Sequence, residues 1–457
     1  MASLVHWPRE LLLLTLERLS TADLSSVSMV NKYFRNVAEP ILYAQVDLPW
    51  DKTNSGRPPI VLLLRTILDR PKVADLIHRM SLLGDDLHGE RPRRYPSPPL
   101  VDTTLLQMDE AEDMIRRTKL AYAESWVKAV RDGSMDAVVC LLLLQLSRLR
   151  FLHVQVNFTK VNKILGMILR AALFEPSRHQ LPTYEHLREV DFSQWPRERK
   201  PKDYKNTQDV LPFVYLPHIR DLSIGIDDTD ELNWPSHPPT STSIQSLKLS
   251  KLREGSLGTF LSGFTSLRKL QYDWGCQNRI EVTQDPDLHL DKMASAVSQL
   301  GGTLEELIIT LDRKPDGSHA RRTHRRMNIH GSPDALTGLC KLRWLSIPWL
   351  LLMGHLTLGN LRDVLPKHLE SLTLTDDIPH RCWRHGRPQT IIVDKVEGEL
   401  EYRQMVSSNL RHISLQLAAF DVPPDTEVGN RLELKAAQAS IELVWPSREM
   451  TGSPPQP

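Results

Sequence analysis

Apolar residues recur along most of the chain in one short pattern, apolar-x-x-apolar-x-apolar. Within each copy, the last two apolar positions alternate with another residue, as in a β-strand that buries one face. Stretches with helical patterning precede several copies, at residues 163–174, 255–264 and 290–300. The pattern therefore predicts successive strand-and-helix units, with strands at Leu149/Leu152/Val154, Leu187/Val190/Phe192, Ile219/Leu222/Ile224, Ile244/Leu247/Leu249, Leu267/Leu270/Tyr272, Leu304/Leu307/Ile309, Leu342/Leu345/Ile347, Leu369/Leu372/Leu374 and Leu410/Ile413/Leu415.

Repeated strand-and-helix units are how a leucine-rich-repeat solenoid buries a continuous core. In this chain the spacing between copies varies and exceeds the roughly 20–29 residues that are usual for that fold. Asparagine stands at the expected ladder position only at Asn157. The sequence therefore predicts an irregular leucine-rich-repeat-like α/β solenoid over residues 149–447. A domain whose βα units are arranged in another way is the alternative.

The first fifty residues show a helical pattern instead. Pro8 suits a first helical turn because it lacks an N–H, and Ser20-x-x-Asp23 is typical of a capping box. Residues 31–38 fit a third helix, which Pro40 should end. Three helices this short make a poor independent core. The surplus leucines must therefore be covered, either by a partner or by the rest of the chain.

The N-terminal residues contain an ordered set of short anchors: Trp7-Pro8-Arg9-Glu10-Leu11-Leu12, Leu19-Ser20, Asp23-Leu24, and Val27-Ser28-Met29-Val30-Asn31-Lys32 with Phe34-Arg35. Together these anchors resemble a known family, the F-box proteins. Residues 40–48 are similar to the segment after the F-box in many filamentous-fungal proteins. Trp7, Asn31 and Phe34 stand where the family commonly has leucine, cysteine and tryptophan.

The resemblance implies a three-helix F-box over residues 4–48. Such a module binds the Skp-type adaptor of an SCF ubiquitin ligase, and through the adaptor a cullin and a RING subunit. Catalysis then belongs to the other subunits, and this chain is not an enzyme. The adaptor-binding residues that the resemblance implies are Trp7, Pro8, Leu11, Leu12, Leu16, Leu19, Leu24, Val27, Val30 and Phe34.

Between the two regions, residues 49–148 are expected to be mainly helical. Helical patterns cover residues 60–68, 104–131 and 135–146, and Pro71 should open another short helix. Residues 79–83 look like a strand, and the four prolines of residues 85–99 predict a loop. The last residues, 448–457, are expected to be a disordered tail.

Composition narrows the possible functions. The chain has 457 residues and a net charge of +1, so no global field favours nucleic acid or an acidic membrane. The four cysteines form no CxxC pair, which argues against disulfide scaffolds and zinc ribbons. No apolar run approaches the roughly 20 residues of a membrane span, and no signal peptide is evident. We expect a cytoplasmic and/or nuclear protein that contacts no membrane.

Candidate chemistry is sparse. No P-loop, GxGxxG, HExxH or GxSxG spacing occurs, so we expect no catalytic residue, metal or cofactor. His380, Cys382 and His385 are weak evidence for zinc, and an ordinary polar loop is the favoured interpretation. The basic loop around residues 321–326 lacks aromatics for base stacking. A solvated loop is favoured there, and a nuclear import signal or an acidic partner is the alternative.

If the body is a solenoid, the residues between the apolar anchors line one open face. That face mixes polar side chains with two large aromatics, which suits a protein target. Loops that cover the aromatics are the alternative. The candidate target-binding residues are Phe151, His153, Lys248, Gln271, Trp344 and Ser346.

The sequence therefore predicts a non-catalytic substrate receptor of an SCF-type ubiquitin ligase, with an unknown protein target. An F-box scaffold without ligase activity is the main alternative. A nucleic-acid binder that uses the basic loop is a weaker one.

Overall fold

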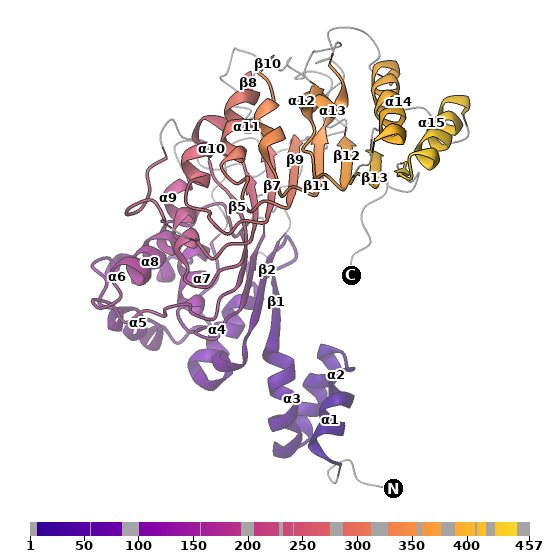
Figure 1. The fold of residues 1–457 in the computed structure, drawn as a ribbon. Coiled ribbons are helices and arrows are strands. Elements are labelled where there is room, and N and C mark those ends of the chain that lie inside the picture. Colours follow the sequence, from indigo (N-terminus) through magenta and orange to yellow (C-terminus); the bar gives the residue numbers. More distant parts are fainter. Residues whose placement is uncertain are drawn as a thin grey trace. The chain divides into compact units, whose positions relative to one another are not determined.

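The structure is a computed structural model that describes residues 7–54, 56–84, 100–155, 157–192, 205–227, 232–240, 242–274, 287–311, 328–353, 359–375, 389–406, 409–416 and 426–445. These residues form a mixed α/β fold built on parallel strands (Figure 1). Packing divides the chain into two units. The first is Met1–Gly225 with Asn233–Pro238, and the second is Ile226–Leu232 with Pro239–Pro457. The domain boundaries expected at residues 48, 148 and 447 stay predictions.

Three helices open the first unit: α1 (Arg9–Leu16), α2 (Thr21–Val30) and α3 (Lys32–Ala44). Ser20 begins α2, because its hydroxyl oxygen accepts the Asp23 N–H at 3.2 Å. Asn31 begins α3 in the same way, with its side-chain oxygen 2.9 Å from the Phe34 nitrogen. Such caps satisfy N–H groups that have no partner inside the helix. All three predicted helices are therefore present, and the predicted starts of the second and third are confirmed.

The predicted end of the third helix at Pro40 is wrong. Helix α3 continues through Pro40 to Ala44. A proline inside a helix loses one backbone hydrogen bond. Here Ile41 and Leu42, the next two residues, pack against the core of the three helices, so burial of their side chains offsets that loss. Strand β1 (Gln45–Pro49) begins at the next residue, so no linker separates the helices from the first strand.

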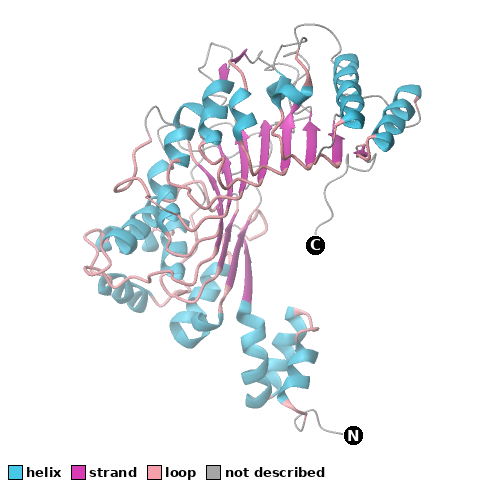
Figure 2. Cartoon of the chain, viewed as in Figure 1, coloured by secondary structure: helices cyan, strands magenta, loops and turns pink. Residues whose placement is uncertain are grey.

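The parallel strands of the first unit follow the order β1-β2-β3-β4-β5. Adjacent strands pair in a register that stacks Val46, Met80, Leu152, Val190 and Leu222 in one row. Figure 2 shows the helices beside these strands. The elements after β1 are α4 (Pro59–Asp69), the 3₁₀ turn η2 (Pro71–Leu76), β2 (Arg79–Leu83), α5 (Met108–Arg117), α6 (Ala123–Arg131), α7 (Met135–Leu143), β3 (Phe151–Val154), α8 (Lys163–Phe174), β4 (Glu189–Phe192), α9 (Thr207–Val210), η3 (Leu211–Tyr215) and β5 (Asp221–Gly225).

The single long helix predicted over residues 104–131 is wrong. The structure has two helices there, α5 and α6, separated by a turn in which Lys119 has a φ of 58°. A lysine pays a steric cost in this left-handed region. The turn lets α6 bury Trp126, whose indole N–H donates to the Ala137 carbonyl of α7 at 3.0 Å.

In the second unit the parallel strands follow the order β6-β7-β9-β11-β12-β13-β14. Their register stacks Leu247, Leu270, Leu307, Leu345 and Leu372 in one buried row. The elements are β6 (Ser246–Ser250), α10 (Glu254–Leu261), β7 (Lys269–Trp274), β8 (Asp287–His289), α11 (Leu290–Ser298), β9 (Glu306–Leu311), β10 (Asn328–His330), η4 (Asp334–Gly338), β11 (Trp344–Pro348), α12 (Trp349–Met353), α13 (Leu361–Val364), β12 (Ser371–Thr375), α14 (Gln389–Met405), β13 (His412–Gln416), α15 (Glu427–Gln438) and β14 (Glu442–Val444).

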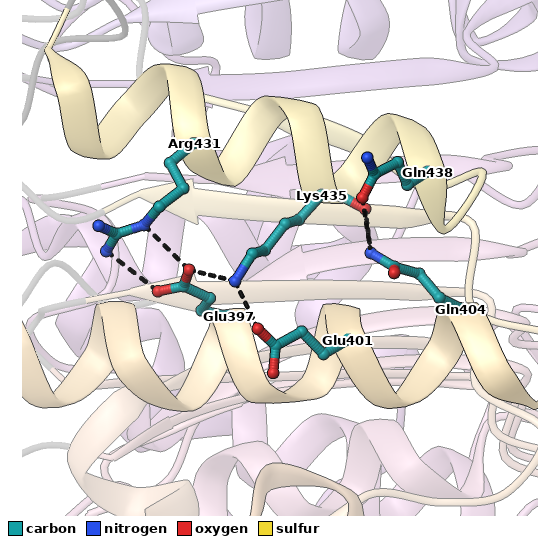
Figure 3. A network of polar contacts seen from close by, with 6 residues as sticks. All are labelled: Glu397, Glu401, Gln404, Arg431, Lys435 and Gln438. Atoms are coloured by element: carbon teal, nitrogen blue, oxygen red, sulfur yellow. Dashed lines mark hydrogen bonds and ion pairs between the residues drawn. The ribbon is translucent and has the colours of Figure 1, made fainter.

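A polar network joins the last two helices of the second unit, α14 and α15 (Figure 3). Glu397 accepts from Arg431 at 2.9 Å and also from Lys435, which contacts Glu401 as well. Gln404 donates to the side chain of Gln438 at 3.3 Å. Residues three and four positions apart lie on one helix face, so the spacing of these side chains brings the two faces together.

Every strand predicted from the repeated apolar pattern is confirmed, as are the helices near residues 163–174, 255–264 and 290–300. The strands β1 and β14, and the separate pair β8–β10, were not predicted. The predicted loop at residues 85–99 and tail at residues 448–457 lie outside the described residues, as do the basic residues 321–326 and the His380, Cys382 and His385 group.

Candidate docking surfaces

The three N-terminal helices have a small core of their own. Leu12 and Leu16 of α1, Leu24 of α2, and Phe34 and Val37 of α3 are buried together. Each helix contributes an apolar face, and the two caps described above fix where α2 and α3 begin. We call residues 7–44 the N-terminal module.

A second set of large apolar side chains on this module is exposed. Leu11 is 51% exposed and Leu14 61%, and their spacing of three residues places them on one face of α1. Trp7, which precedes the helix, is also exposed. Met29 is 70% exposed and Val30 66% at the end of α2, and Tyr33 at the start of α3 is also exposed. The module therefore keeps apolar surface in contact with water even though its core is complete.

The structure divides the expected adaptor-binding residues into two groups. Trp7, Pro8, Leu11 and Val30 are exposed, whereas Leu19 and Val27 are half-buried and pack against the core. The others are core residues that support the module and have no surface for a partner: Leu12, Leu16, Leu24 and Phe34.

Exposed Leu14, Met29 and Tyr33 were missed from the sequence. For Leu14 the signal was present, because Leu11 and Leu14 lie at helical spacing just as Leu12 and Leu16 do. Spacing alone does not say which of two leucine faces points inward.

Phe151 and His153 lie on the non-core face of the first unit's strands. Both side chains are half-buried. The guanidinium of Arg79 lies 4.1 Å from the centre of the Phe151 ring, a cation–π contact that covers part of the ring. His153 contacts the Asp191 carboxylate on the next strand at 3.4 Å. Neighbours on the same sheet thus partly cover both side chains.

Acidic side chains lie next to Phe151 and His153 on the same face of the strands. Glu189 is paired in register with Phe151 on one side and Asp221 on the other. Partial burial and the neighbouring carboxylate of Asp221 raise the pKa of Glu189, an effect that Arg79 opposes. This face is therefore polar and locally acidic.

In the second unit, Lys248, Gln271, Trp344 and Ser346 all lie on the non-core face, at alternate positions of their strands. Trp344 is 43% exposed, between Glu306 and Ser371 in register. Lys248 is exposed, whereas Gln271 and Ser346 are half-buried. The alternation expected from the apolar pattern is confirmed, and a large aromatic lies open on this face.

The described part of the chain holds little other candidate chemistry. It contains no group of three His, Cys, Asp or Glu side chains placed to hold a metal ion. None of its helices has both the length and the apolar character needed to cross a bilayer. Of the cysteines it includes, Cys140 is buried and Cys340 exposed, and both are free thiols.

The exposed apolar side chains of the module and the open strand face around Trp344 are thus the main candidate sites, and both suit macromolecular contact. No protein-family model matches this chain, and no curated protein matches it.

Proposed function

We propose that this chain is a non-catalytic substrate receptor of an SCF-type ubiquitin ligase. In this proposal the N-terminal module is an F-box that docks on a Skp-type adaptor, which recruits a cullin and a RING subunit. The observation that carries the proposal is the exposure of Leu11, Leu14, Met29 and Val30 on a module whose core is already filled. Exposed apolar side chains grouped on a small module are typical of a protein-binding surface.

The size of the apolar surface supports a stable contact. Fully burying one Leu, Val or Met side chain contributes roughly 1.5–3 kcal/mol. Because these side chains are about half to two-thirds exposed, covering each one contributes about 1–2 kcal/mol. The free energy gained from several such contacts offsets part of the entropy lost on association.

The parallel strands after the N-terminal module, which we call the body, support the proposal that the chain binds a protein target. We interpret these strands, each with the same alternation of core and surface positions, as an irregular leucine-rich-repeat-like solenoid that binds a protein target. Trp344 is the proposed anchor on the second unit, because a partly exposed tryptophan among polar neighbours is typical of interface hot spots.

Docking can be tested with purified chain and purified Skp-type adaptor. The double variant Leu11→Ser, Leu14→Ser removes two exposed apolar side chains of α1. We expect its dissociation constant to rise by a factor of about 30–1,000, from a loss of about 2–4 kcal/mol. Its free energy of unfolding should stay within about 1 kcal/mol of that of the unmodified chain, because substitutions of surface residues cost little stability.

Leu62→Ser is the matched control. Leu62 is also an exposed leucine of a helix in the first unit, at 45% exposure, but it belongs to α4 rather than to the module. Its variant should bind the adaptor normally. Unchanged adaptor binding by the double variant would refute the docking assignment.

Ligase function needs a separate measurement, because a scaffold could also use the adaptor. Affinity purification from cells with and without a cullin-ligase inhibitor should recover cullin, together with proteins that accumulate under the inhibitor. Recovery of the adaptor without cullin would contradict the receptor proposal and favour the scaffold.

A further inference from the structure

Arginine occupies the same position in three successive strand motifs of the first unit. Arg150, Arg188 and Arg220 each follow the first apolar anchor of their motif. The Arg188 N–H donates to the Arg150 carbonyl at 2.9 Å, and the Arg220 N–H donates to the Arg188 carbonyl at 2.8 Å. Neighbouring strands lie about 4.8 Å apart, so three like charges follow one another along the edge of the strands. We call these residues the arginine row.

The charges of the arginine row have no acidic partner in the described residues. Arg150 and Arg220 are exposed, and within that part of the chain no ion pair or hydrogen bond involves their side chains. The Arg188 guanidinium donates to two neutral acceptors, the Glu185 carbonyl at 2.8 Å and the His218 carbonyl at 3.5 Å. These carbonyls hold its orientation and leave its charge uncompensated.

In the second unit, the residues at the same motif position carry different charges. At that position β6 is preceded by neutral Gln245, and the later motifs alternate in charge: Arg268, Glu305, Arg343, Glu370 and Arg411. Arg268 lies 3.8 Å from Glu305, and Arg343 lies 3.7 Å from Glu370. Alternating charges across neighbouring strands attract, whereas like charges repel. The unpaired row of the first unit is therefore a departure from the charge balance that the same chain achieves elsewhere.

We propose that the arginine row binds an acidic segment of a protein, with Asp or Glu side chains seated against the guanidinium groups. A guanidinium matches a carboxylate with two parallel hydrogen bonds. One carboxylate can bridge only neighbouring arginines, and the row extends over two strand intervals, about 10 Å. A run of acidic residues fits it better than a single small anion.

Nucleic acid fits less well. Its binding depends on many phosphate contacts along an extended basic surface. Here Glu189 and Asp221, the first residues of β4 and β5, directly follow Arg188 and Arg220 in the sequence, and the net charge of the whole chain is only +1. A local acidic segment can avoid these carboxylates, whereas a long polyanion meets them.

The proposal deepens the proposed function by naming a class of target, and its biological role rests on that function. The binding itself is measured on the full chain without adaptor. The probe is a short fluorescein-labelled peptide of alternating Glu and Gly, compared with the corresponding Gln and Gly peptide by fluorescence anisotropy. The full chain should bind the Glu peptide more tightly, with an affinity that falls as salt is raised.

The variant Arg150→Gln, Arg220→Gln should lower affinity for the Glu peptide at least about tenfold. It should fold normally, because neither side chain makes a contact that the fold needs. The matched control, Arg268→Gln with Arg343→Gln, removes the same charge at the same motif position of the second unit and should bind the peptide as before. Adaptor binding should be unaffected by either variant, so failure of this proposal is distinct from failure of the docking proposal.

Three results would overturn the proposal. The first is no preference for the Glu peptide over the Gln peptide. The second is equal loss of binding in the test variant and the control, which would show a general charge effect. The third is binding of a short oligothymidylate, but not of the Glu peptide, in a manner that depends on the arginine row, since this would assign the row to nucleic acid.

Discussion

A buried carboxylate, Asp136 of α7, should make the stability of the first unit depend on pH near neutrality. Its carboxylate accepts the backbone N–H of Ile164 at 2.8 Å and that of Leu165 at 3.3 Å, both at the start of α8. It also accepts from the Cys140 thiol at 3.7 Å. Asp136 thus links α7 to α8 by capping the second helix from another element.

Burial raises the pKa of Asp136 to about 7, and the two backbone N–H groups only partly oppose this effect. In the unfolded chain the pKa is about 3.9. Between these values the folded state binds a proton that the unfolded state does not, so stability falls as pH rises. With about 1.4 kcal/mol for each pKa unit, the loss from pH 4 to pH 7 is at most about 4 kcal/mol. Above the folded pKa, this contribution is fully lost and stays constant.

Asp136→Asn removes the titration and retains a side-chain oxygen for α8. Urea unfolding of both proteins at several pH values should show the variant gaining stability relative to the unmodified chain between about pH 4 and pH 7. Hydrogen exchange at the start of α8 should follow the same trend. Groups that do not interact with Asp136 titrate equally in both proteins. The difference between the two stability curves therefore reports Asp136 together with Asp209 and Cys140, which interact with it. Parallel stability curves over this range would show that the carboxylate is ionised throughout and that the reasoning is wrong.

Three further predictions concern the second unit. Glu397→Ala removes the acceptor shared by Arg431 and Lys435, and should speed hydrogen exchange in α15 by a factor of about two to five without changing exchange in α10. Trp344→Ala should weaken target binding by about 2 kcal/mol with little loss of stability. By contrast, Leu345→Ala should cost about 2–5 kcal/mol of stability, because that side chain is buried. Equal destabilisation by the last two changes would place Trp344 in the core.

The strands of the body were predictable because their apolar residues obey a simple spacing. Leu345 and Ile347 alternate with exposed or half-buried Trp344 and Ser346, which is the signal of a strand with one buried face. Helix boundaries were less predictable. The break at Lys119 depends on how α6 packs on α7, and the continuation through Pro40 depends on Ile41 and Leu42 meeting the module core. Tertiary packing overrides local preference in both places.

The module shows why its surface was harder to predict than its fold. Four leucines follow one another from Leu11 to Leu14, and every face of α1 therefore carries an apolar residue. Helical spacing predicts the helix but is satisfied by either face. Leu12 is buried because it packs in one core with Leu24 of α2 and Phe34 of α3, whereas Leu14 lies outside this core and is exposed.

The first strand ties the module directly to the body. Tyr43, Val46 and Leu48 fit the same apolar spacing as the later strands, so the same pattern is enough to predict this strand too. In the structure β1 pairs with β2, and α3 ends at the residue before β1. Arg70, just after α4, holds Glu39 of α3 through two hydrogen bonds of 2.8 Å. A module that continues directly into a paired strand and is also held from its side has less freedom than one on a flexible linker. A partner bound to α1 would therefore be coupled to the first strand through α3 and β1.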